Sequence, residues 1–373
     1  MARVAVAMSG GVDSAVAAAL LVDQGHVVVG LTMNLWPDWL PEPDEGVKAC
    51  CGVGAIGDAR AVAQRLAIRH YVLNMREEFE RAVIDEFCDE YARGRTPNPC
   101  IACNRAIKFS LLLRKVRAMG LDYLATGHYA RVRHDEEAGR FFLLRARDPE
   151  KDQSYVLYAL RQDQLRHLRL PVGEFSKPEI RAVARRLGLG VADKPDSQEI
   201  CFVPRGHYMD VVARRRPEAA RPGPILDGSG RQIGTHGGLA RFTIGQRRGL
   251  GIALGRPRYV AGIDPARNAV IVGEKDDLLV AEITAREVNW IGGPAPDRPL
   301  RVTARVRHAG KETPATVWMD RTGALRVRFD EPQRAAAPGQ AVTLYDGEVV
   351  LGGGVIDGAR RSEEEFAALR GRH

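Results

Sequence analysis

The first 130 residues alternate short continuous apolar runs with longer runs whose apolar residues recur at helical spacing. The short runs predict strands buried on both faces, and the longer runs predict amphipathic helices. Strands that alternate with helices form a parallel sheet, and ligands of such sheets bind beyond the carboxyl ends of the strands. The sequence therefore predicts an α/β, Rossmann-like fold with strands at 3–8, 27–33, 71–75 and 123–126 and helices at 13–24, 57–68, 77–93 and 104–119.

The rest of the chain divides into a helical stretch and a region of short strands. Residues 151–190 are predicted to be helical, and after about residue 203 glycine and proline become frequent. The run DGSG at 227–230 predicts a hairpin turn, and short alternating segments from about residue 282 predict a small antiparallel barrel. A chain of 373 residues exceeds the ~250–300 residues of one domain. We expect a catalytic domain at 1–205, a small linking domain at 206–280 and a C-terminal β-barrel at 281–373.

The chain carries 55 basic and 47 acidic residues, which gives a net charge of +8. This charge favours a polyanionic partner such as a nucleic acid. The arginine-rich composition that GC-rich genomes encode explains it equally well. The longest apolar run, 15–22, is too short to cross a bilayer, and the N-terminus lacks a signal-peptide pattern. We therefore expect a cytoplasmic protein without a membrane partner.

Six cysteines are present, and a cytosolic enzyme of this length does not need disulfide bonds. Such cysteines are buried, bind metals or take part in catalysis. Cys88 lies in a predicted helix and is expected in the core. Cys50 and Cys51 end a long polar loop, 36–54, and their role stays open.

The run SGGVDS at 9–14 follows the first predicted strand and opens the first predicted helix. Glycines let the backbone approach a ligand closely, and the first N–H groups of a helix favour phosphate. No Gly-Lys-Ser/Thr follows, so this is not a Walker A loop. An ordinary turn capped by Ser9 would explain a glycine pair, but the full run resembles the pyrophosphate loop of the N-type ATP pyrophosphatases. Those enzymes cleave ATP between its α- and β-phosphates and adenylate an oxygen of their substrate.

The run TPNPCIACN at 96–104 contains a CxxC pair, Cys100 and Cys103. We expect its prolines to end the preceding helix and a new helix to begin at Asn104. Cys103 would then lie at a helix N-terminus, where a thiol pKa falls below its usual value of about 8.5. Spacing alone leaves a zinc half-site, a buried pair and a redox pair open, although a four-cysteine zinc site would need a second CxxC.

Cys201 is a single cysteine between Ile200 and Phe202, and by itself this setting favours a buried core residue. The three runs together change that interpretation, because the chain resembles the tRNA-specific 2-thiouridylases over nearly its whole length. The matching runs, in family order, are SGGVDS at 9–14, TPNPxxxCN at 96–104, ATGHY at 125–129, KDQSY at 151–155, DSxxICF at 196–202 and TIGQRRG at 243–249.

This resemblance implies ATP-dependent 2-thiolation of the wobble uridine in tRNAs for Lys, Glu and Gln. ATP with Mg²⁺ would adenylate the C2 oxygen and release pyrophosphate. A sulfur-donor protein would load Cys201 as a persulfide, and Cys103 would be the nucleophile that attacks it. Sulfur would then replace AMP at C2, and a Cys103–Cys201 disulfide would remain to be reduced. Adenylation turns the C2 oxygen into a leaving group, and a soft, low-pKa sulfur nucleophile suits the displacement.

The resemblance also implies binding residues. Those for ATP are Ala7, Met8, Ser9, Gly10, Gly11, Val12, Asp13, Ser14, Met33 and Gly127. Those for tRNA are Asn98, Pro99 and Cys100 at the target base, and His128, Lys151, Asp152, Gln153, Arg307, His308 and Gln340 elsewhere. From spacing alone, His128 is an ordinary strand-end histidine, and Arg307 fits a solvated barrel face equally well.

Many family members have aspartate where this chain has Cys100. Cys100, Cys103 and Cys201 could therefore hold an iron–sulfur cluster whose open iron carries the donor sulfur, in place of the persulfide. Otherwise Cys100 is a spare thiol and no metal is held, which is the interpretation we favour. Two other functions stay open: a different adenylating ATP pyrophosphatase, which would not need both cysteines, and a tRNA-binding module without turnover.

Overall fold

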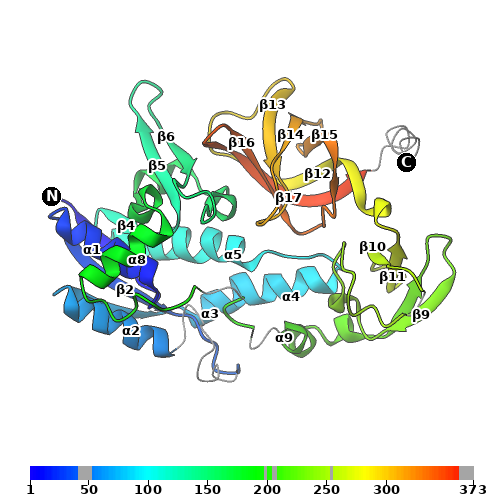
Figure 1. The fold of residues 1–373 in the computed structure, drawn as a ribbon, viewed down its shortest axis with the longest axis horizontal. Coiled ribbons are helices and arrows are strands. Elements are labelled where there is room, and N and C mark those ends of the chain that lie inside the picture. Colours follow the sequence, from blue (N-terminus) through cyan, green and yellow to red (C-terminus); the bar gives the residue numbers. More distant parts are fainter. Residues whose placement is uncertain (41–52, 197–199, 204–207, 253–254, 361–373) are drawn as a thin grey trace. The chain divides into compact units, whose positions relative to one another are not determined.

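The computed structural model describes residues 1–40, 53–196, 200–203, 208–252 and 255–360 (Figure 1). Cys50, Cys51 and most of the predicted 36–54 loop lie outside these residues, as do positions 197–199 beside Cys201. The chain forms two compact units. Unit 1 comprises Met1–Ile84, Pro99–His207 and Glu348–Val350, and unit 2 comprises Asp85–Asn98, Tyr208–Gly347 and Leu351–His373.

Unit 1 is built on a parallel sheet, which confirms the predicted α/β fold. Its strands in spatial order are β3 (Arg69–Asn74), β2 (Val27–Asn34), β1 (Arg3–Ala7), β4 (Tyr123–Ala125) and β7 (Leu168–Arg169). In the central strand, Val4 lies opposite Val28 on one side and Tyr123 on the other. Val4 and Val6 are buried because helices cover this sheet. Apolar runs without alternation are therefore the correct signal for these strands.

Helices α1 (Val12–Asp23), α2 (Val53–Arg65) and α8 (Lys177–Arg186) pack into the core around β1. Figure 1 shows α1 and α8 side by side, and Val16 and Ala17 of α1 share that core with Ile180 and Ala184 of α8. α8 begins with a capping box: Ser176 and Glu179 each use a side chain to cap the backbone of the other. This box fixes where α8 starts and therefore where Lys177 lies.

Two helices can be compared with their predicted limits, and the first, predicted at 77–93, matches within one residue at each end. The first is continuous from α3 (Arg76–Phe79) through a π-helical stretch (Glu80–Ile84) into α4 (Asp85–Ala92). Gly94, at φ +68°, ends it, because the N–H groups of Gly94 and Arg95 bond back to the carbonyls of Tyr91 and Glu90. The expectation that the prolines at 97 and 99 end this helix is therefore wrong.

The second helix begins five residues earlier than predicted. It runs from α5 (Pro99–Ala102) through a π-helical stretch (Cys103–Leu112) into α6 (Leu113–Ala118). Pro99 starts it because proline lacks only an N–H that a first-turn residue does not need, and its φ suits a helix. Cys103 therefore lies one turn inside the helix, and the expectation that it lies at the helix N-terminus is wrong.

The segment between β4 and α8 is also less helical than predicted for 151–190. A hairpin of β5 (Ala130–Asp135) and β6 (Arg140–Arg145) comes first, and Gly139 at φ +62° occupies its turn. Short 3-10 turns at Ser154–Leu157 and Pro171–Glu174 flank α7 (Gln162–Arg166) and β7. Only α8 is a sustained helix in this stretch.

Unit 2 contains a small sheet and a barrel. The sheet has the order β10 (Tyr259–Asp264), β11 (Ala269–Gly273), β8 (Gly223–Leu226) and β9 (Gln232–His236), preceded by α9 (Tyr208–Arg215). β8 and β9 pair antiparallel across residues 227–231, which confirms the predicted hairpin. Ile225, Val260 and Val270 form its core with Phe242 and Leu250.

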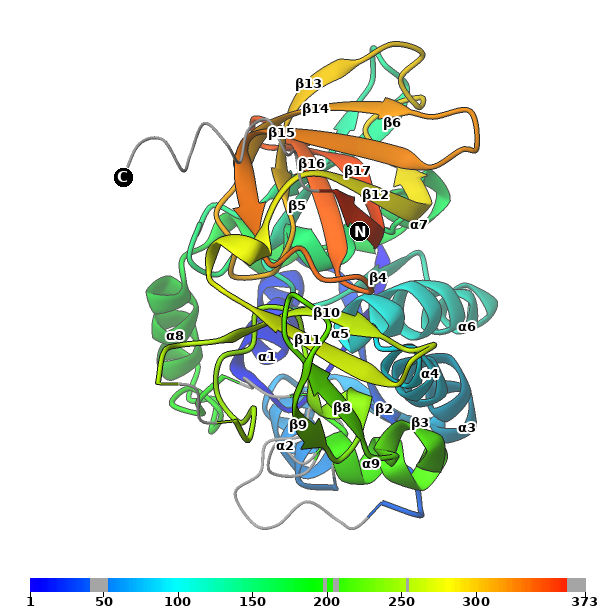
Figure 2. The ribbon, with the colours of Figure 1, turned by 90° about the vertical axis from the view of Figure 1, so that its right-hand side faces the viewer.

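The barrel of unit 2 confirms the predicted C-terminal fold. Its strands in pairing order are β12 (Leu279–Trp290), β15 (Leu325–Arg334), β14 (Thr313–Met319), β13 (Leu300–Arg305), β16 (Ala341–Asp346) and β17 (Val349–Arg360). β17 pairs back onto β12, so the barrel is closed (Figure 2). As the alternation predicts, Val302 and Ala304 point into the core, together with Val306 just beyond β13. No helix within the described ranges has the length and apolar character to cross a membrane.

We expect Phe329→Ala to destabilise the barrel, because Phe329 is only 2% exposed in its core. A cavity of this kind costs about 3–5 kcal/mol of unfolding free energy. Arg321→Ala, at an exposed turn between β14 and β15, is the control and should change stability by less than about 0.5 kcal/mol. Denaturant unfolding followed by circular dichroism measures both. Equal midpoints for the two variants would contradict this packing.

Candidate active site

The SGGVDS run forms a tight loop between β1 and α1. Gly10 has φ +67°, and a Cβ there would lie 2.5 Å from the carbonyl oxygen of Ala55 in α2, so only glycine fits. The Ser9 N–H donates to Ser14 Oγ at 3.1 Å, and Ser14 Oγ donates to the Gly11 carbonyl at 3.1 Å. Gly11 caps α1 without a side-chain bond, so the first N–H groups of α1 remain available for an anion.

The predicted nucleotide residues gather at one edge of the sheet. The loop follows β1, Met33 lies near the end of β2, and Gly127 lies two residues beyond β4, so all three lie at the carboxyl ends of neighbouring strands. A Cβ on Gly127 would come within 2.6 Å of the backbone nitrogen of Ser14. Gly127 is therefore the residue that lets the β4 loop pack on the first turn of α1. Contact of these residues with ATP stays a prediction.

A buried lysine links this loop to the segment that carries Cys201. Lys177 Nζ lies 2.7 and 2.9 Å from the two carboxylate oxygens of Asp13, and 2.7 Å from Asp196 Oδ1. Its side chain is 9% exposed. Tyr129 donates its hydroxyl to Asp13 Oδ1 at 2.7 Å, and Lys151 Nζ lies 2.9 Å from Asp196 Oδ2. Lys177 thus bridges two carboxylates, one in each segment.

The ionisation of these groups follows from burial and from their partners. Burial alone would raise the pKa of Asp196, but hydrogen bonds and charges from Lys177 and Lys151 lower it below its ordinary value. Burial, then the charge and hydrogen bond of Asp13, raise the pKa of Tyr129, which keeps its hydroxyl protonated as a donor. Asp196 is therefore an anion and Tyr129 is neutral at physiological pH.

Lys177 was missed as a site residue from the sequence, where residues 177–186 predict only a basic helix. The bridge depends on three segments far apart in the chain, which no local pattern reveals. The available signals were Asp13 within a glycine loop and the capping box that places Lys177 in the first turn of α8. Lys194 is a second such residue: its Nζ bonds to the Gly10 carbonyl at 3.1 Å and pairs with Asp58 of α2.

The KDQ run holds the fold around the site. Asp152 is 6% exposed and accepts bonds from the Ala146 N–H at 3.0 Å and from Ser154 Oγ at 2.8 Å. Gln153 Oε1 accepts the Tyr129 N–H at 2.9 Å. Lys151 is the member of the run whose side chain pairs with Asp196. The predicted contact of these three residues with tRNA is untested.

His128 lies in the loop after β4, three residues beyond its last residue, which is close to the strand end that the sequence predicts. Its Nδ1 is 2.7 Å from the hydroxyl of Thr126, and its ring packs at 5.6 Å from Phe109 of the π-helical stretch. Burial, and next the charge of Lys108, lower the pKa of His128 well below its usual value. The imidazole is therefore neutral at physiological pH, and it would approach tRNA as a hydrogen-bonding or stacking group, not as a cation.

The cysteines occupy different environments. Cys88 is fully buried, and burial followed by the charge of Asp85 raises its pKa to about 12, which confirms it as a core residue. Cys100 is exposed in the first turn of α5, Cys103 is 8% exposed at the start of the π-helical stretch, and Cys201 is half-buried. Each of the four is a thiol in this structure. π-helical segments are rare and occur often at functional sites.

Two neighbours fix the cysteine-bearing segments. Asn104 is 3% exposed and donates Nδ2 to the Val156 carbonyl at 3.0 Å. Phe202 is 1% exposed, and its ring meets the ring of Phe79 edge-on at 5.7 Å. Among the described residues, no group of three or more His, Cys, Asp or Glu side chains could hold a metal ion. The cluster held by Cys100, Cys103 and Cys201 stays a prediction.

The remaining predicted tRNA residues lie in unit 2. Arg307 and His308 are exposed just beyond β13. Arg301, on the same face as Arg307, is held by two hydrogen bonds to Asp330, at 2.7 and 2.6 Å. Gln340 instead supports the backbone ahead of Asn98: its Nε2 donates to the carbonyls of residues 96 and 97 at 2.9 and 3.4 Å. The structure does not test contact of these residues with tRNA.

Comparison with known proteins gives three matching family models. They are described as the tRNA methyl transferase HUP domain at 2–205, the tRNA methyl transferase PRC-barrel domain at 209–274 and the Aminomethyltransferase beta-barrel domain at 280–356. The first model covers more than half of the chain. The fold, the glycine loop and this match define the class of protein as a HUP-domain α/β protein with appended β domains.

Curated relatives narrow the class to a family. A protein of Moorella thermoacetica described as "tRNA-specific 2-thiouridylase MnmA" is 55% identical over 94% of this chain and 98% of its own. A protein of Carboxydothermus hydrogenoformans with the same description is 50% identical over 95% of this chain and 97% of its own. The chain belongs to the tRNA-specific 2-thiouridylase family, which confirms the resemblance seen in the sequence. A solved 4-thiouridine synthetase–RNA complex with bound ATP is 16% identical at a TM-score of 0.36, covering 58% of this chain and 51% of that chain, too distant to bear on fold or function.

We expect Lys177→Met to loosen the segment that carries Cys201, because Asp13 and Asp196 would face each other without the cation between them. Removing one partner from a buried ion pair costs about 3–5 kcal/mol. Cys201 should then react severalfold faster with iodoacetamide, measured by mass spectrometry with exposed Cys100 as the internal reference. Arg186→Met, which removes an exposed cation from the same helix, is the control. Equal alkylation rates in the two variants would show that the bridge does not hold the segment.

Proposed function

We propose that this protein makes 2-thiouridine in tRNA at the expense of ATP. The support is family membership at about half identity over nearly the full length of both chains. The single structural observation behind the proposal is the Lys177 bridge, which ties the glycine loop to the segment of Cys201. Such a bridge suits an enzyme in which nucleotide chemistry and sulfur chemistry share one site.

The glycine loop is proposed to hold the phosphates of Mg²⁺-bound ATP, with Met33 and Gly127 beside the nucleotide. The first N–H groups of α1 point where an anion would lie, and they stabilise charge that develops as pyrophosphate leaves. ATP would adenylate the C2 oxygen of the wobble uridine in tRNAs for Lys, Glu and Gln. This step makes C2 electrophilic because AMP is a far better leaving group than an oxide.

Sulfur is proposed to arrive as a persulfide on Cys201, loaded by a sulfur-donor protein. The Cys103 thiolate attacks the Cys201 sulfur, forms a disulfide with it and releases the terminal sulfur as hydrosulfide. The hydrosulfide attacks C2 and AMP leaves, so an external dithiol must reduce the disulfide before the next turnover. Asn98, Pro99 and Cys100 are proposed to contact the target base. The further residues proposed to contact the tRNA are His128, Lys151, Asp152, Gln153, Arg307, His308 and Gln340.

The division into domains at 1–205, 206–280 and 281–373 is part of this proposal. The family models match 2–205, 209–274 and 280–356, so the boundaries between them fall near the proposed ones, whereas the third match ends at residue 356 and the proposed domain at 373. The first domain would carry the chemistry. The other two would bind tRNA.

We expect the purified protein, given unmodified tRNA, ATP and a persulfide donor, to form 2-thiouridine with one AMP and one pyrophosphate per turnover. Cys201→Ala and Cys103→Ala should lower thiouridine formation by at least about a thousandfold, because each removes a reacting sulfur. Both should still release pyrophosphate. Liquid chromatography with mass spectrometry of digested tRNA measures the product. Thiouridine from Cys201→Ala would sink the persulfide route, and absence of tRNA-dependent pyrophosphate release would sink the proposal.

A substitution of Cys100 distinguishes the persulfide route from the iron–sulfur cluster route. We expect Cys100→Ala to keep its thiolation rate within about threefold, because an exposed thiol outside the sulfur relay is dispensable. Anaerobically purified protein should contain no iron and show no charge-transfer absorbance. An inactive Cys100→Ala together with bound iron would establish the cluster instead.

A further inference from the structure

The TIGQRRG run at 243–249 has two halves with different surroundings. Its first half is structural: the Thr243 N–H donates to Gln246 Oε1 at 3.0 Å, and the Gly245 N–H donates to the Val260 carbonyl at 2.8 Å. Gly245 has φ +89°, and a Cβ there would lie 2.7 Å from that of Ala335. The second half, from Arg247 on, continues into GLGI, where Leu250 joins the core of the small sheet, whereas the side chains of Arg247 and Arg248 are exposed.

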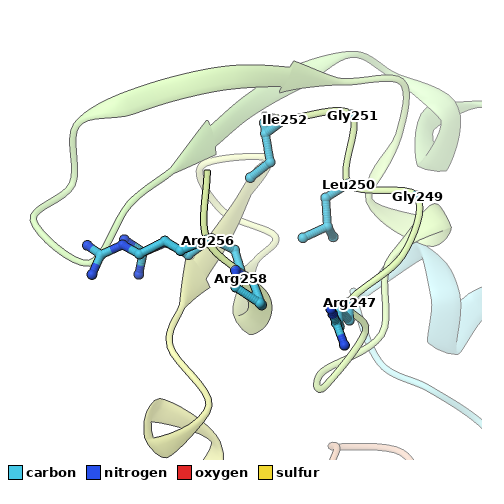
Figure 3. A pocket seen from close by; sticks show the side chains of 8 residues that line it. Arg247, Gly249, Leu250, Gly251, Ile252, Arg256 and Arg258 are labelled. Atoms are coloured by element: carbon cyan, nitrogen blue, oxygen red, sulfur yellow. The ribbon is translucent and has the colours of Figure 1, made fainter. Parts of the chain in front are cut away.

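This second half lines a recess of about 410 Å³ in unit 2 (Figure 3). Figure 3 shows Arg256 and Arg258 on one side of it, Arg247 on another, and Leu250 with Ile252 between them. Pro257 also contributes an apolar surface. The recess therefore combines a cationic rim with an apolar floor.

The rim of the recess has more guanidinium groups than carboxylates. Glu274 pairs with Arg256 at 2.8 Å and with Arg258 at 3.3 Å, so one carboxylate serves two guanidinium groups. Arg247 is exposed and makes no hydrogen bond or ion pair with any residue that the structure describes. Arg258 is 17% exposed, and its Nε is buried without a hydrogen-bond partner in the described structure. The rim keeps unused donors for an anion.

The surrounding segment is strongly basic. Residues 209–274 contain eleven arginines and five carboxylates, which supply +6 of the net charge of +8. A Debye length of about 8 Å at physiological salt lets such neighbours add to one field. Gly249 and Gly251, at φ +73° and +67°, leave the loop backbone without side chains that would bar a ligand.

We propose that this recess binds the sugar–phosphate backbone of the RNA substrate, with a phosphate at the arginine rim and a ribose or base face on Leu250 and Ile252. The proposal rests on the proposed function, which makes RNA the substrate. Guanidinium forks match phosphate oxygens, and the volume of the recess suits one nucleotide. An acidic protein surface would satisfy the arginines as well, but the proposed function already requires that an RNA be bound. Contacts of this kind position an RNA without selecting its sequence.

The test is tRNA affinity as a function of salt, by fluorescence anisotropy between 50 and 300 mM KCl. We expect Arg247→Ala to weaken binding about tenfold at low salt and to lower the slope of log affinity against log salt by about 0.7–0.9, the effect of one lost phosphate contact. Arg247→Lys should keep the slope and lose part of the affinity. Arg267→Ala, in the β10–β11 turn of the same sheet and away from the recess, is the matched control.

Identical affinity and slope for Arg247→Ala and Arg267→Ala would overturn the proposal. Binding of inorganic phosphate or ATP that is lost in Arg247→Ala, while the tRNA affinity of that variant is unchanged, would identify a small-anion site and also overturn the proposal. Loss of binding to a persulfide-donor protein in Arg247→Ala, again with unchanged tRNA affinity, would identify a protein interface. The thiolation assay on the wild-type protein distinguishes this proposal from the proposed function. If tRNA binding depends on Arg247 but the wild-type protein forms no thiouridine, the proposed function is refuted and the recess remains an RNA-binding site.

Discussion

The ion pairs of Lys177 with Asp13 and Asp196 are the interaction on which the catalytic half of the molecule depends. A charge buried as deeply as Lys177 is costly unless it is paired and hydrogen-bonded, and here two carboxylates pair it. Each carboxylate belongs to a different segment, so the loss of either would leave Lys177 with one partner in place of two. The bridge therefore fixes the relative placement of the glycine loop and the stem of the Cys201 segment within unit 1.

Two glycines make that placement sterically feasible. Gly10 lets the loop lie against Ala55, and Gly127 lets the loop after β4 lie against the first turn of α1. Because β1 and β4 are neighbours in the sheet, their carboxyl ends deliver both loops to one edge. The sheet thus brings the two loops to one edge, the glycines let them pack closely, and the ion pairs of Lys177 hold the glycine loop in place.

Much of this could be predicted from the sequence, and the errors have identifiable physical causes. Continuous apolar runs gave the parallel strands, and the alternation around Val302 gave the barrel, since both patterns report burial directly. The helix that carries Cys103 was placed too late because Pro99 was taken as a terminator, although proline suits the first turn of a helix equally well. The π-helical stretch has no sequence signature. The Lys177 bridge was out of reach, because it joins residues 164 and 19 positions apart through tertiary packing alone.

Charge is used differently beside the glycine loop of unit 1 and at the recess of unit 2. In unit 1 the cations near the glycine loop, Lys177 and Lys194, are paired with carboxylates, so they order the protein, and in the proposed function the phosphates are left to backbone N–H groups. In unit 2 the arginines at the recess outnumber their single carboxylate. Paired, buried charge gives precise geometry, which chemistry needs, whereas unpaired, exposed charge gives long-range attraction, which a large polyanion needs. One chain that must both activate a base and hold an entire RNA requires both arrangements.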